Sequence, residues 1–525
     1  MTDLSPYNPT TGIYTFTRPP ISLPQSPTTS IVDFLFRNLP TYSNRPALID
    51  PRSNQIITFS QLKQRVSVLA HALRHTHNIS KGDVVLIFSP NSILFPVAFF
   101  ALASIGAITT TANPVYTVNE LSHQINDSKP KLIITVDELR FKVNGFNLPI
   151  VDLEKENYSD LDLIEKSRNG SAPAPVPSVS QNDVAALLYS SGTTGLSKGV
   201  VLTHRALMAT ALMVTSDQEF YDKGRRSVFL CVVPLFHIMG LITVTYSQLQ
   251  RGNTVVVMPR FALEKALEAM EKYGVTHLYT PPPVVVAMAK RAAVVRRYDT
   301  TSLREIVSGA APLGKDVMDE CSKVLPHAKI LQGYGMTESG GIASIENTQM
   351  GSSHSGSSGV LCPGMESKII DIETSKHLPP NHLGEIWLCG PNLMQQYFHN
   401  KEETEQTIDK EGWLHTGDLG YFDEEGRIYI VDRLKELIKY KGYQVAPAEL
   451  EALLITHPEI MDAAVIPYPD EEAGEIPMAY LVRKVGSLVI DEEVQSFIAK
   501  QVAPFKRIRK VVLSTSFQKP LQGRF

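Results

Sequence analysis

The alternation of short apolar runs with amphipathic segments constrains the fold of this chain more than any other feature. Runs such as DVVLIFS (83–89) and PKLIITV (130–136) are bounded by turn residues, as buried strands are. Segments with apolar residues at helical spacing lie between such runs, including TFSQLKQRVSVLAHALRHT (58–76) and ALEKALEAMEKYG (262–274). The same alternation resumes after residue 182. This order predicts an α/β fold in which several sheets are covered by helices.

The texture of the sequence changes near residue 380. Segments such as GEIWLCG (384–390) and GWLHTGDLGYFDEEGRIYIVDR (412–433) are turn-rich and favour short antiparallel strands. We therefore expect a large multi-layer domain over residues 1–432 and a small, mobile α+β domain over residues 433–525. The Pro/Ser/Ala-rich stretch 168–182 is expected to be an exposed linker.

Composition excludes several classes of protein. Of the 525 residues, 43% are hydrophobic and 20% are charged, with a net charge of -4, which argues against disorder and against nucleic-acid binding driven by bulk charge. The four cysteines are widely spaced, so neither a disulfide framework nor a zinc site is expected. The uncharged stretch Ser92–Pro114 is interrupted by Pro96 and Gly106, which favours a buried helix and strand over a membrane span.

The string YSSGTTGLSKGV (189–200) carries the strongest chemical pattern. It follows an apolar strand, and its glycines allow backbone N–H groups to turn inward while hydroxyls and one lysine add donors and charge. It is not a Walker A loop, because no glycine directly precedes the lysine. A GTTG turn alone is usually a surface loop, but the full string predicts a phosphate site made of Ser190, Ser191, Gly192, Thr193, Thr194 and Lys198.

Five further strings follow in order: PLFHIMG (234–240), SGAAPLG (308–314), QGYGMTES (332–339), HTGDLGYFDEEG (415–426) and DRLKELIKYKGYQVAPAELE (432–451). Together with the phosphate string they resemble the ANL superfamily of adenylate-forming enzymes, most of all plant 4-coumarate:CoA ligases and their ligase-like relatives. The resemblance covers nearly the whole chain. It implies a reaction in two steps: a carboxylate attacks the α-phosphate of ATP to give acyl-AMP and pyrophosphate, and the thiol of coenzyme A then displaces AMP.

The resemblance also implies roles for individual residues. Besides the phosphate string, the ATP/AMP site would contain Ala310, Ala311, Gln332, Gly333, Tyr334, Thr337, Asp418, Arg433, Lys435 and Lys439. Glu338 would help to hold Mg²⁺, a hard cation that prefers carboxylate and phosphate oxygens. Asp418 would accept hydrogen bonds from the ribose hydroxyls, assisted by Arg433. Each of these residues has an ordinary structural interpretation alone, but their joint occurrence in family order favours the functional one.

The remaining assignments concern the acid, CoA and the second step. The acyl pocket would be lined by His237, Met239, Ile242, Gly340 and Gly341, with His237 positioning the reacting carboxylate. CoA would contact Arg260, Lys441, Gly442 and Gln444, and Lys439 and Lys441 would act in the second pose of the small domain. Lys435 would be the hinge about which that domain swings.

The acid itself is inferred from the residues after PLFH. Coumarate-using relatives typically have Tyr and Asn where this chain has Met239 and Ile242, which would leave a phenol hydroxyl buried without a partner at a cost of roughly 1–3 kcal/mol. We therefore expect a medium- or long-chain aliphatic acid or a cyclopentanone-alkanoic acid of the jasmonate-precursor type. A hydroxycinnamate is the second hypothesis. Together with the resemblance to plant ligases, these two hypotheses imply a role in the fatty-acid or phenylpropanoid metabolism of a plant.

Other interpretations of the sequence stay open. An oxidase of the luciferase kind and an adenylation unit that loads a carrier protein share the fold, and a catalytically impaired nucleotide-binding homologue is a third alternative. The C-terminus Gly-Arg-Phe lacks the Ser-Lys-Leu type of peroxisomal address, so a cytosolic location is expected, or a peroxisomal one if the native chain is longer. We expect a monomer that binds small molecules, with no nucleic acid and no transmembrane segment.

The chain ends on FQKPLQGRF, where relatives carry a loop of the Pro-Lys-Ser-Pro-x-Gly-Lys type. In the family the lysine of that loop bridges the α-phosphate and the carboxylate in the first step. Here Arg524 occupies its place, and the helix that usually follows is missing. Arginine keeps the charge, but its planar fork is larger than an ammonium group. Arg524 is therefore expected to act in catalysis within an altered, shortened loop.

Replacing Arg524 with Lys should accelerate pyrophosphate release from ATP and acid, because a compact point charge fits between the two reactants better than a guanidinium. Thioester formation from preformed acyl-AMP should change less. Stopped-flow measurement of both half-reactions checks this. An unchanged rate of pyrophosphate release would refute the assignment.

Overall fold

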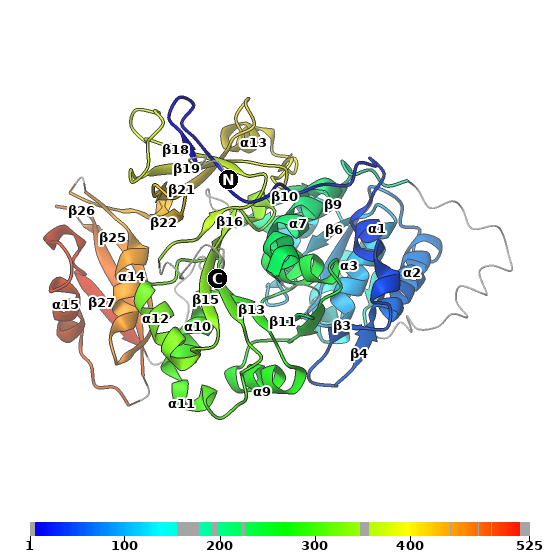
Figure 1. Ribbon diagram of the computed structural model, residues 1–525, viewed down its shortest axis with the longest axis horizontal. Coiled ribbons are helices and arrows are strands. Elements are labelled where there is room, and N and C mark those ends of the chain that lie inside the picture. Colours follow the sequence, from blue (N-terminus) through cyan, green and yellow to red (C-terminus); the bar gives the residue numbers. More distant parts are fainter. Residues whose placement is uncertain are drawn as a thin grey trace.

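The computed structural model describes residues 6–154, 178–190, 197–221, 226–346, 356–441, 443–470, 472–484 and 486–514. Within these ranges the chain forms four sheets covered by helices (Figure 1). Strands and helices alternate through the first two sheets, because apolar runs buried on both faces need helical crossovers to run parallel. The predicted α/β class is confirmed.

The first sheet has the strand order β20-β10-β9-β6-β5-β7-β8. Its inner strands β9, β6, β5, β7 and β8 run parallel, whereas β10 and β20 are antiparallel additions at one edge. The strands are β5 (Val84–Phe88), β6 (Ile108–Thr111), β7 (Leu132–Thr135), β8 (Ile150–Asp152), β9 (Val184–Ser190), β10 (Lys198–Thr203) and β20 (Gln396–Tyr397). The antiparallel edge joins residues nearly two hundred positions apart.

The second sheet has the order β17-β16-β15-β14-β13-β11-β12-β3-β4 and is parallel from β15 to β3. Its strands are β3 (Pro46–Ile49), β4 (Ile56–Thr58), β11 (Val228–Cys231), β12 (Thr254–Val257), β13 (His277–Thr280), β14 (Glu305–Ser308), β15 (Lys329–Tyr334), β16 (Ser344–Ile345) and β17 (Val360–Leu361). In both sheets the predicted strand segments are strands.

Helices cover these two sheets. They are α1 (Ile31–Phe36), α2 (Phe59–His75), α3 (Leu94–Ser104), α4 (Val118–Ser128), α5 (Arg140–Val143), α7 (His204–Tyr221), α8 (Ser247–Leu249), α9 (Leu263–Tyr273), α10 (Pro282–Lys290), α11 (Ala292–Val295) and α12 (Lys315–Val324). The helix expected over 58–76 is α2, which starts with a capping box between Thr58 and Gln61. The uncharged stretch from Ser92 is the buried helix α3 followed by β6, as expected. Within the described ranges, no helix is long and apolar enough to cross a membrane.

The last two sheets are mostly antiparallel. The third has the order β1-β2-β18-β19-β21-β22, formed by β1 (Tyr7–Asn8), β2 (Ile13–Thr15), β18 (Glu366–Ile370), β19 (Gly384–Cys389), β21 (Leu414–Phe422) and β22 (Ile428–Arg433). The fourth contains β23 (Ile438–Tyr440), β24 (Tyr443–Val445), β25 (Ile460–Asp470), β26 (Gly474–Arg483) and β27 (Lys510–Ser514). The helices here are α13 (Lys401–Thr407), α14 (Pro447–Thr456) and α15 (Asp491–Ala499).

The hydrophobic core is divided in the same way. The first three sheets share one large core cluster, which runs from Tyr14 to Ile428. A separate cluster from Ile438 to Ile508 lies within the fourth sheet and its helices. Figure 1 shows this last part, in orange and red, beside α10 and α12. The boundary expected near residue 432 remains a prediction, and the two clusters are consistent with it.

The junction between the two core clusters is held by polar contacts. The carboxylate of Asp432, at the end of β22, accepts a hydrogen bond from the backbone N–H of Ala448 at 2.9 Å. This contact joins the third sheet to the first turn of α14. The Lys290 ammonium of α10 donates to the backbone carbonyl of Ile460 in β25.

Two features differ from the sequence-based expectations. The stretch 168–182 was expected to be exposed, but Val179 and Gln181 are buried, and the Gln181 amide donates to the carbonyls of Pro24 and Ser26 at 2.7 Å each. Residues 168–177 lie outside the described ranges. In addition, residues Met239–Tyr246 form a π-helix, η4, which the uniformly apolar string MGLITVTY does not reveal.

One buried amide holds the loops that follow three strands. Asn91, just after β5, donates to the carbonyls of Val233 at 2.9 Å and Met258 at 3.0 Å. Its side-chain oxygen accepts the N–H of Leu235 at 2.7 Å. These bonds fix the PLFH loop after β11 and the turn after β12 against the first sheet.

Replacing Asn91 with Ala should therefore destabilise the protein by about 2–4 kcal/mol, because three hydrogen bonds to buried backbone groups would be lost. Differential scanning fluorimetry measures the change in the thermal midpoint. The matched control is Asn144→Ala, at an exposed asparagine. A decrease no larger than that of the control would show that the three bonds contribute little.

Candidate active site

Several of the sequence-predicted site residues lie at the carboxyl ends of parallel strands. Ser190 ends β9, the PLFH loop follows β11, the SGAAPLG string follows β14, and Thr337 and Glu338 follow β15. In open α/β sheets this is the edge at which ligands bind. Thr337 and Glu338 lie in a short 3₁₀ turn and are both buried.

Glu338 connects three parts of the structure. One of its carboxylate oxygens accepts hydrogen bonds from the Ser190 hydroxyl at 2.7 Å and from the Tyr397 hydroxyl at 2.9 Å. Its backbone carbonyl accepts the N–H of Met394 at 2.8 Å. Burial, followed by the Glu338 charge, raises the pKa of Tyr397, so this phenol remains a hydrogen-bond donor at neutral pH.

The geometry around Glu338 fits a magnesium ion. Both hydrogen bonds reach the same oxygen, Oε1, so the other carboxylate oxygen is left for a cation. Within the described residues no group of three or more His, Cys, Asp or Glu could hold a metal by itself. Mg²⁺ commonly takes one or two protein carboxylates and completes its shell with phosphates and water. A single buried carboxylate next to a phosphate string matches that requirement.

Lys198 has a partner that the sequence did not indicate. Its ammonium forms an ion pair with Glu403 of α13 and lies 5.1 Å from the centre of the Tyr397 ring. Nothing in the string NKEETEQT distinguishes Glu403 from its acidic neighbours, so sequence reasoning missed it. Tyr397 was also missed, because it reaches the site only through the pairing of β20 with β10. Ser191, Gly192, Thr193 and Thr194 lie outside the described residues.

Asp418 lies in a second polar cluster. The Tyr334 hydroxyl donates to its carboxylate at 2.6 Å, and Arg433 approaches it at 3.3 Å from the paired strand β22. Burial raises the pKa of Asp418, although Arg433 and the Tyr334 bond act in the opposite direction. The cluster brings together three of the residues assigned to the nucleotide.

The residues expected to border the adenine are brought together by β14 and β15. The Gln332 amide oxygen accepts the N–H of Leu313 at 2.9 Å, which fastens the SGAAPLG loop to β15. Ala310 and Ala311 are exposed in that loop, and Ala310 adopts a left-handed backbone with φ of 69°. Such a conformation is unusual for a residue with a side chain and is held here by its surroundings. Gly333, in β15, pairs with Ile345 of β16.

His237 lies in the PLFH loop at the start of η4. The side chain of His237 is exposed to solvent. The surrounding protein nevertheless desolvates the ring and lowers its pKa, which indicates that the imidazole lies in a recess of the surface. The imidazole is therefore neutral at neutral pH. This agrees with the expected positioning role and leaves it untested.

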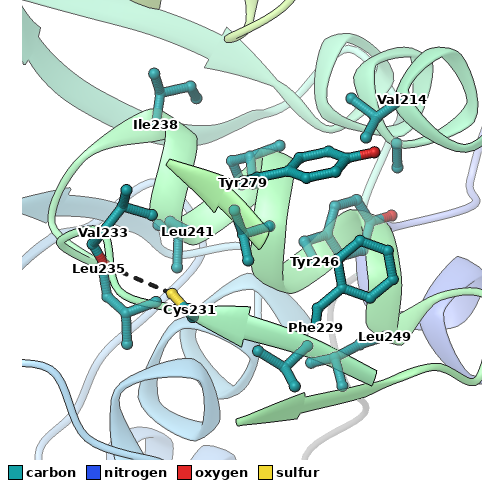
Figure 2. Packing of buried hydrophobic residues seen from close by; sticks show 14 of the residues in the cluster. Val214, Phe229, Cys231, Val233, Leu235, Ile238, Leu241, Tyr246, Leu249 and Tyr279 are labelled. Atoms are coloured by element: carbon teal, nitrogen blue, oxygen red, sulfur yellow. Dashed lines mark hydrogen bonds between the residues drawn. The ribbon is translucent and has the colours of Figure 1, made fainter. Parts of the chain in front are cut away.

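The π-helix η4 separates a packed side from a side that faces Gly341. Figure 2 shows Leu241 and Tyr246 over the side chains of Phe229 and Cys231 in β11. On the other side, a Cβ on Gly341 would lie 2.9 Å from the Thr243 hydroxyl, and the φ of Gly341 is 99°. Gly341 is therefore required for close approach.

The other residues expected to line the acyl pocket differ in their burial and contacts. A Cβ on Gly340 would lie 2.5 Å from the Thr210 hydroxyl, Met239 is half-buried, and Ile242 is fully buried. Thr243 was not among the expected residues. Its hydroxyl is buried without a hydrogen-bond partner, whereas the hydroxyl of Thr245 donates to the carbonyl of Gly240 at 2.7 Å.

The residues assigned to CoA and to the second pose lie on the surface. Lys435, Lys439, Lys441, Gln444 and Arg260 are all exposed. Lys441 pairs with Glu472 at 3.9 Å, and the backbone N–H of Lys439 donates to Glu475 at 2.7 Å, both within the fourth sheet and its loops. Gly442 and Arg524 lie outside the described residues.

Comparison with known proteins places this geometry in a family. Residues 35–398 match the family model described as AMP-binding enzyme, and residues 449–523 match the AMP-binding enzyme C-terminal domain. The chain is 47% identical over 530 residues to a probable CoA ligase of Humulus lupulus, covering 99% of this chain and 95% of the relative. It is 45% identical over 517 residues to the peroxisomal OPC-8:0-CoA ligase 1 of Arabidopsis thaliana, with 97% and 93% covered.

Solved structures agree with these matches. ATP-bound MatB from Rhodopseudomonas palustris superimposes with a TM-score of 0.82 at 26% identity, covering 94% of this chain and 96% of that one. The o-succinylbenzoate CoA synthetase of Bacillus subtilis in complex with ATP and magnesium gives 0.78 at 26% identity, with 92% and 96% covered.

These matches confirm the predicted enzyme class, an acid–thiol ligase, and the predicted requirement for ATP, Mg²⁺ and CoA. The chain belongs to the AMP-binding enzyme family, among the CoA ligases that resemble the plant 4-coumarate–CoA ligase-like proteins.

Proposed function

We propose that this protein converts a carboxylic acid, ATP and CoA into an acyl-CoA, AMP and pyrophosphate through an acyl-adenylate. The observation that carries the proposal is the buried Glu338 carboxylate, which lies between Ser190, the last residue of β9, and Tyr397. A buried carboxylate beside a phosphate string and a paired lysine is suited to ATP with its metal.

The first step requires that ATP be held in line with the acid. Ser190 and Lys198, with Ser191 to Thr194 between them, would bind the β- and γ-phosphates, and Thr337 would bind the α-phosphate. Mg²⁺ bound at Glu338 would neutralise phosphate charge and favour departure of pyrophosphate. Because the chemistry proceeds by displacement at phosphorus, positioning and charge supply most of the catalysis. Arg524 would add a positive charge at the reacting oxygens.

The nucleoside would be oriented by Asp418. The Tyr334 hydroxyl already occupies one of its oxygens at 2.6 Å, and Arg433 keeps the site compatible with a carboxylate charge. The remaining acceptor capacity would serve the two ribose hydroxyls. The loop of Ala310 and Ala311 would border the adenine.

The second step would use the small domain over residues 433–525. Lys435 would be its hinge, and Lys439, Lys441, Gly442, Gln444 and Arg260 would meet the adenylate and CoA. A small cluster of Leu419, Leu437 and Ala446 connects the two parts, next to the separate cores on either side. Because this apolar junction is small, little hydrophobic surface would have to separate when the small domain moves.

The acid is proposed to be a medium- or long-chain aliphatic acid, or a cyclopentanone-alkanoic acid. Met239 and Ile242 supply apolar, adaptable surface, and Thr243 offers one unpaired hydroxyl. The relative whose name specifies OPC-8:0 supports the second choice. A hydroxycinnamate is the alternative acid, and nucleotide binding without catalysis is the alternative function. We further propose a monomer located in the cytosol, with the peroxisome, named for one relative, as the alternative location.

A panel of acids tests the proposed function. With ATP, Mg²⁺ and CoA, the protein should release pyrophosphate and form thioesters fastest with C8–C16 acids or cyclopentanone-alkanoic acids, because the side chains of Met239 and Ile242 cannot accept a hydrogen bond from a phenol hydroxyl as Asn or Tyr would. Coupled pyrophosphate detection and mass spectrometry of the CoA products provide the measurement. A clear preference for 4-coumarate would reject the acid class, and the absence of pyrophosphate with every acid would favour the binding-only alternative.

Thr243→Val should reduce discrimination between a keto acid and a plain fatty acid of equal length. The lost hydroxyl would remove one hydrogen bond to the ketone, which should lower the ratio of kcat/KM values roughly five- to tenfold. Thr245→Val is the matched control, because its hydroxyl bonds to the helix backbone. Equal ratios in the two variants would exclude Thr243 as a substrate contact.

A further inference from the structure

A short segment that starts in the edge strand β20 and continues into α13 carries two side chains that contact Lys198 and Glu338. Tyr397, in β20, donates its hydroxyl to Glu338. Six residues later, Glu403 of α13 pairs with Lys198. The two contacts come from one short stretch, residues 397–404, which we call the edge segment.

The edge segment is fixed to the strand that begins with Lys198. Tyr397 pairs with Val200 of β10, and the N–H of Phe398 donates to the carbonyl of Gly199 at 2.7 Å. The carboxylate of Glu403 and the ammonium of Lys198 are therefore held by backbone bonds between neighbouring strands.

Local hydrogen bonds also set the position of Glu403 on its helix. The Asn400 side chain accepts the N–H of Glu403 at 3.2 Å, as an N-cap does. The Thr404 hydroxyl accepts the N–H of Tyr397 at 2.9 Å and donates to the carbonyl of Asn400 at 2.7 Å. These local hydrogen bonds thus fix the turn between β20 and α13.

The ion pair is buried, unlike another pair on the same helix. The side chains of Lys198 and Glu403 are 7% and 21% exposed. In the second pair, the Lys401 ammonium lies 3.5 Å from the Glu405 carboxylate, and the two side chains are 87% and 67% exposed. An exposed pair contributes little, but a buried ammonium that loses its partner is costly. The Tyr397 ring beneath Lys198 adds a cation–π contact at 5.1 Å.

We propose that Glu403 is a positioning residue, which holds the Lys198 ammonium at the phosphate string before ATP binds. A free lysine side chain has many rotamers, and its restriction would otherwise accompany ATP binding. The carboxylate of Glu403 contacts the Lys198 ammonium, and Glu403 would act on ATP through that lysine. This inference rests on the proposed function, because it assumes that Lys198 binds the phosphates of ATP.

The test compares Glu403→Gln with Glu405→Gln in the full-length protein. Glu403→Gln should raise KM for ATP about tenfold in acid-dependent ATP–pyrophosphate exchange, with KM for the acid unchanged. Thioester formation from preformed acyl-AMP and CoA should remain at the wild-type rate. Glu405→Gln should leave all three quantities unchanged. An unchanged or lowered KM for ATP in Glu403→Gln would overturn the proposal.

Two further variants separate positioning from general stability. In a Lys198→Met background, Glu403→Gln should have no additional effect on KM for ATP, because its target is gone. Glu403→Asp, which retains the charge, should recover part of the wild-type KM. Additive effects in the double variant, or a loss of activity that follows only the thermal midpoint, would overturn the proposal.

The failure of this inference can be distinguished from failure of the proposed function. If the wild-type protein shows no acid-dependent exchange with any acid, the proposed function itself fails, and the inference fails with it. If the wild type is active while the Glu403 and Glu405 variants behave alike, only the role of Glu403 is rejected.

Discussion

The buried carboxylate of Glu338 is the interaction on which the arrangement of the candidate site depends. Its oxygen receives hydroxyl groups from β9 and β20, while its backbone carbonyl receives the N–H of Met394. The first sheet, the second sheet and the antiparallel edge therefore meet at one residue. A buried charge is tolerated only where such partners exist, so these three elements are required to close around it.

A shared pattern links three carboxylates, of which Glu338 and Asp418 are buried and Asp127 is half-buried. Tyr397 donates to Glu338, Tyr334 to Asp418 and Tyr189 to Asp127. A phenol stabilises a carboxylate without neutralising it, because burial raises the pKa of each tyrosine and the proton stays on its oxygen. At Glu338 and Asp418 the carboxylates would then remain available to the proposed metal and to the sugar hydroxyls.

Sequence analysis could identify features that local spacing encodes. Apolar periodicity and helix capping predict the strand at 84–88 and the helix α2 with its cap at Thr58. They also predict which residues follow each strand. Grouping these residues at one edge also follows, because parallel strands carry their carboxyl ends to the same side. The role expected of Glu338 at Mg²⁺ came from the resemblance to adenylate-forming enzymes and not from this pattern.

Sequence analysis missed the features that local residue spacing does not encode. Glu403 and Tyr397 reach the site because β20 pairs with β10, which is a contact between residues distant in sequence. The π-helix η4 lacks a polar face and so has no period to detect. Gln181 is buried because its amide finds two carbonyls near residue 25, although its neighbours in sequence are typical of a linker.

The cap on α14 has a mechanical consequence. Asp432 belongs to the last strand before the proposed hinge at Lys435, whereas Ala448, whose N–H it receives at 2.9 Å, lies beyond it. A rotation about Lys435 would pull these two atoms apart and expose the first turn of α14 at the same moment. If the small domain rotates about Lys435, the helix end and the hinge are therefore coupled: loss of the Asp432 bond would free an N–H at the start of α14 that could receive another negative group.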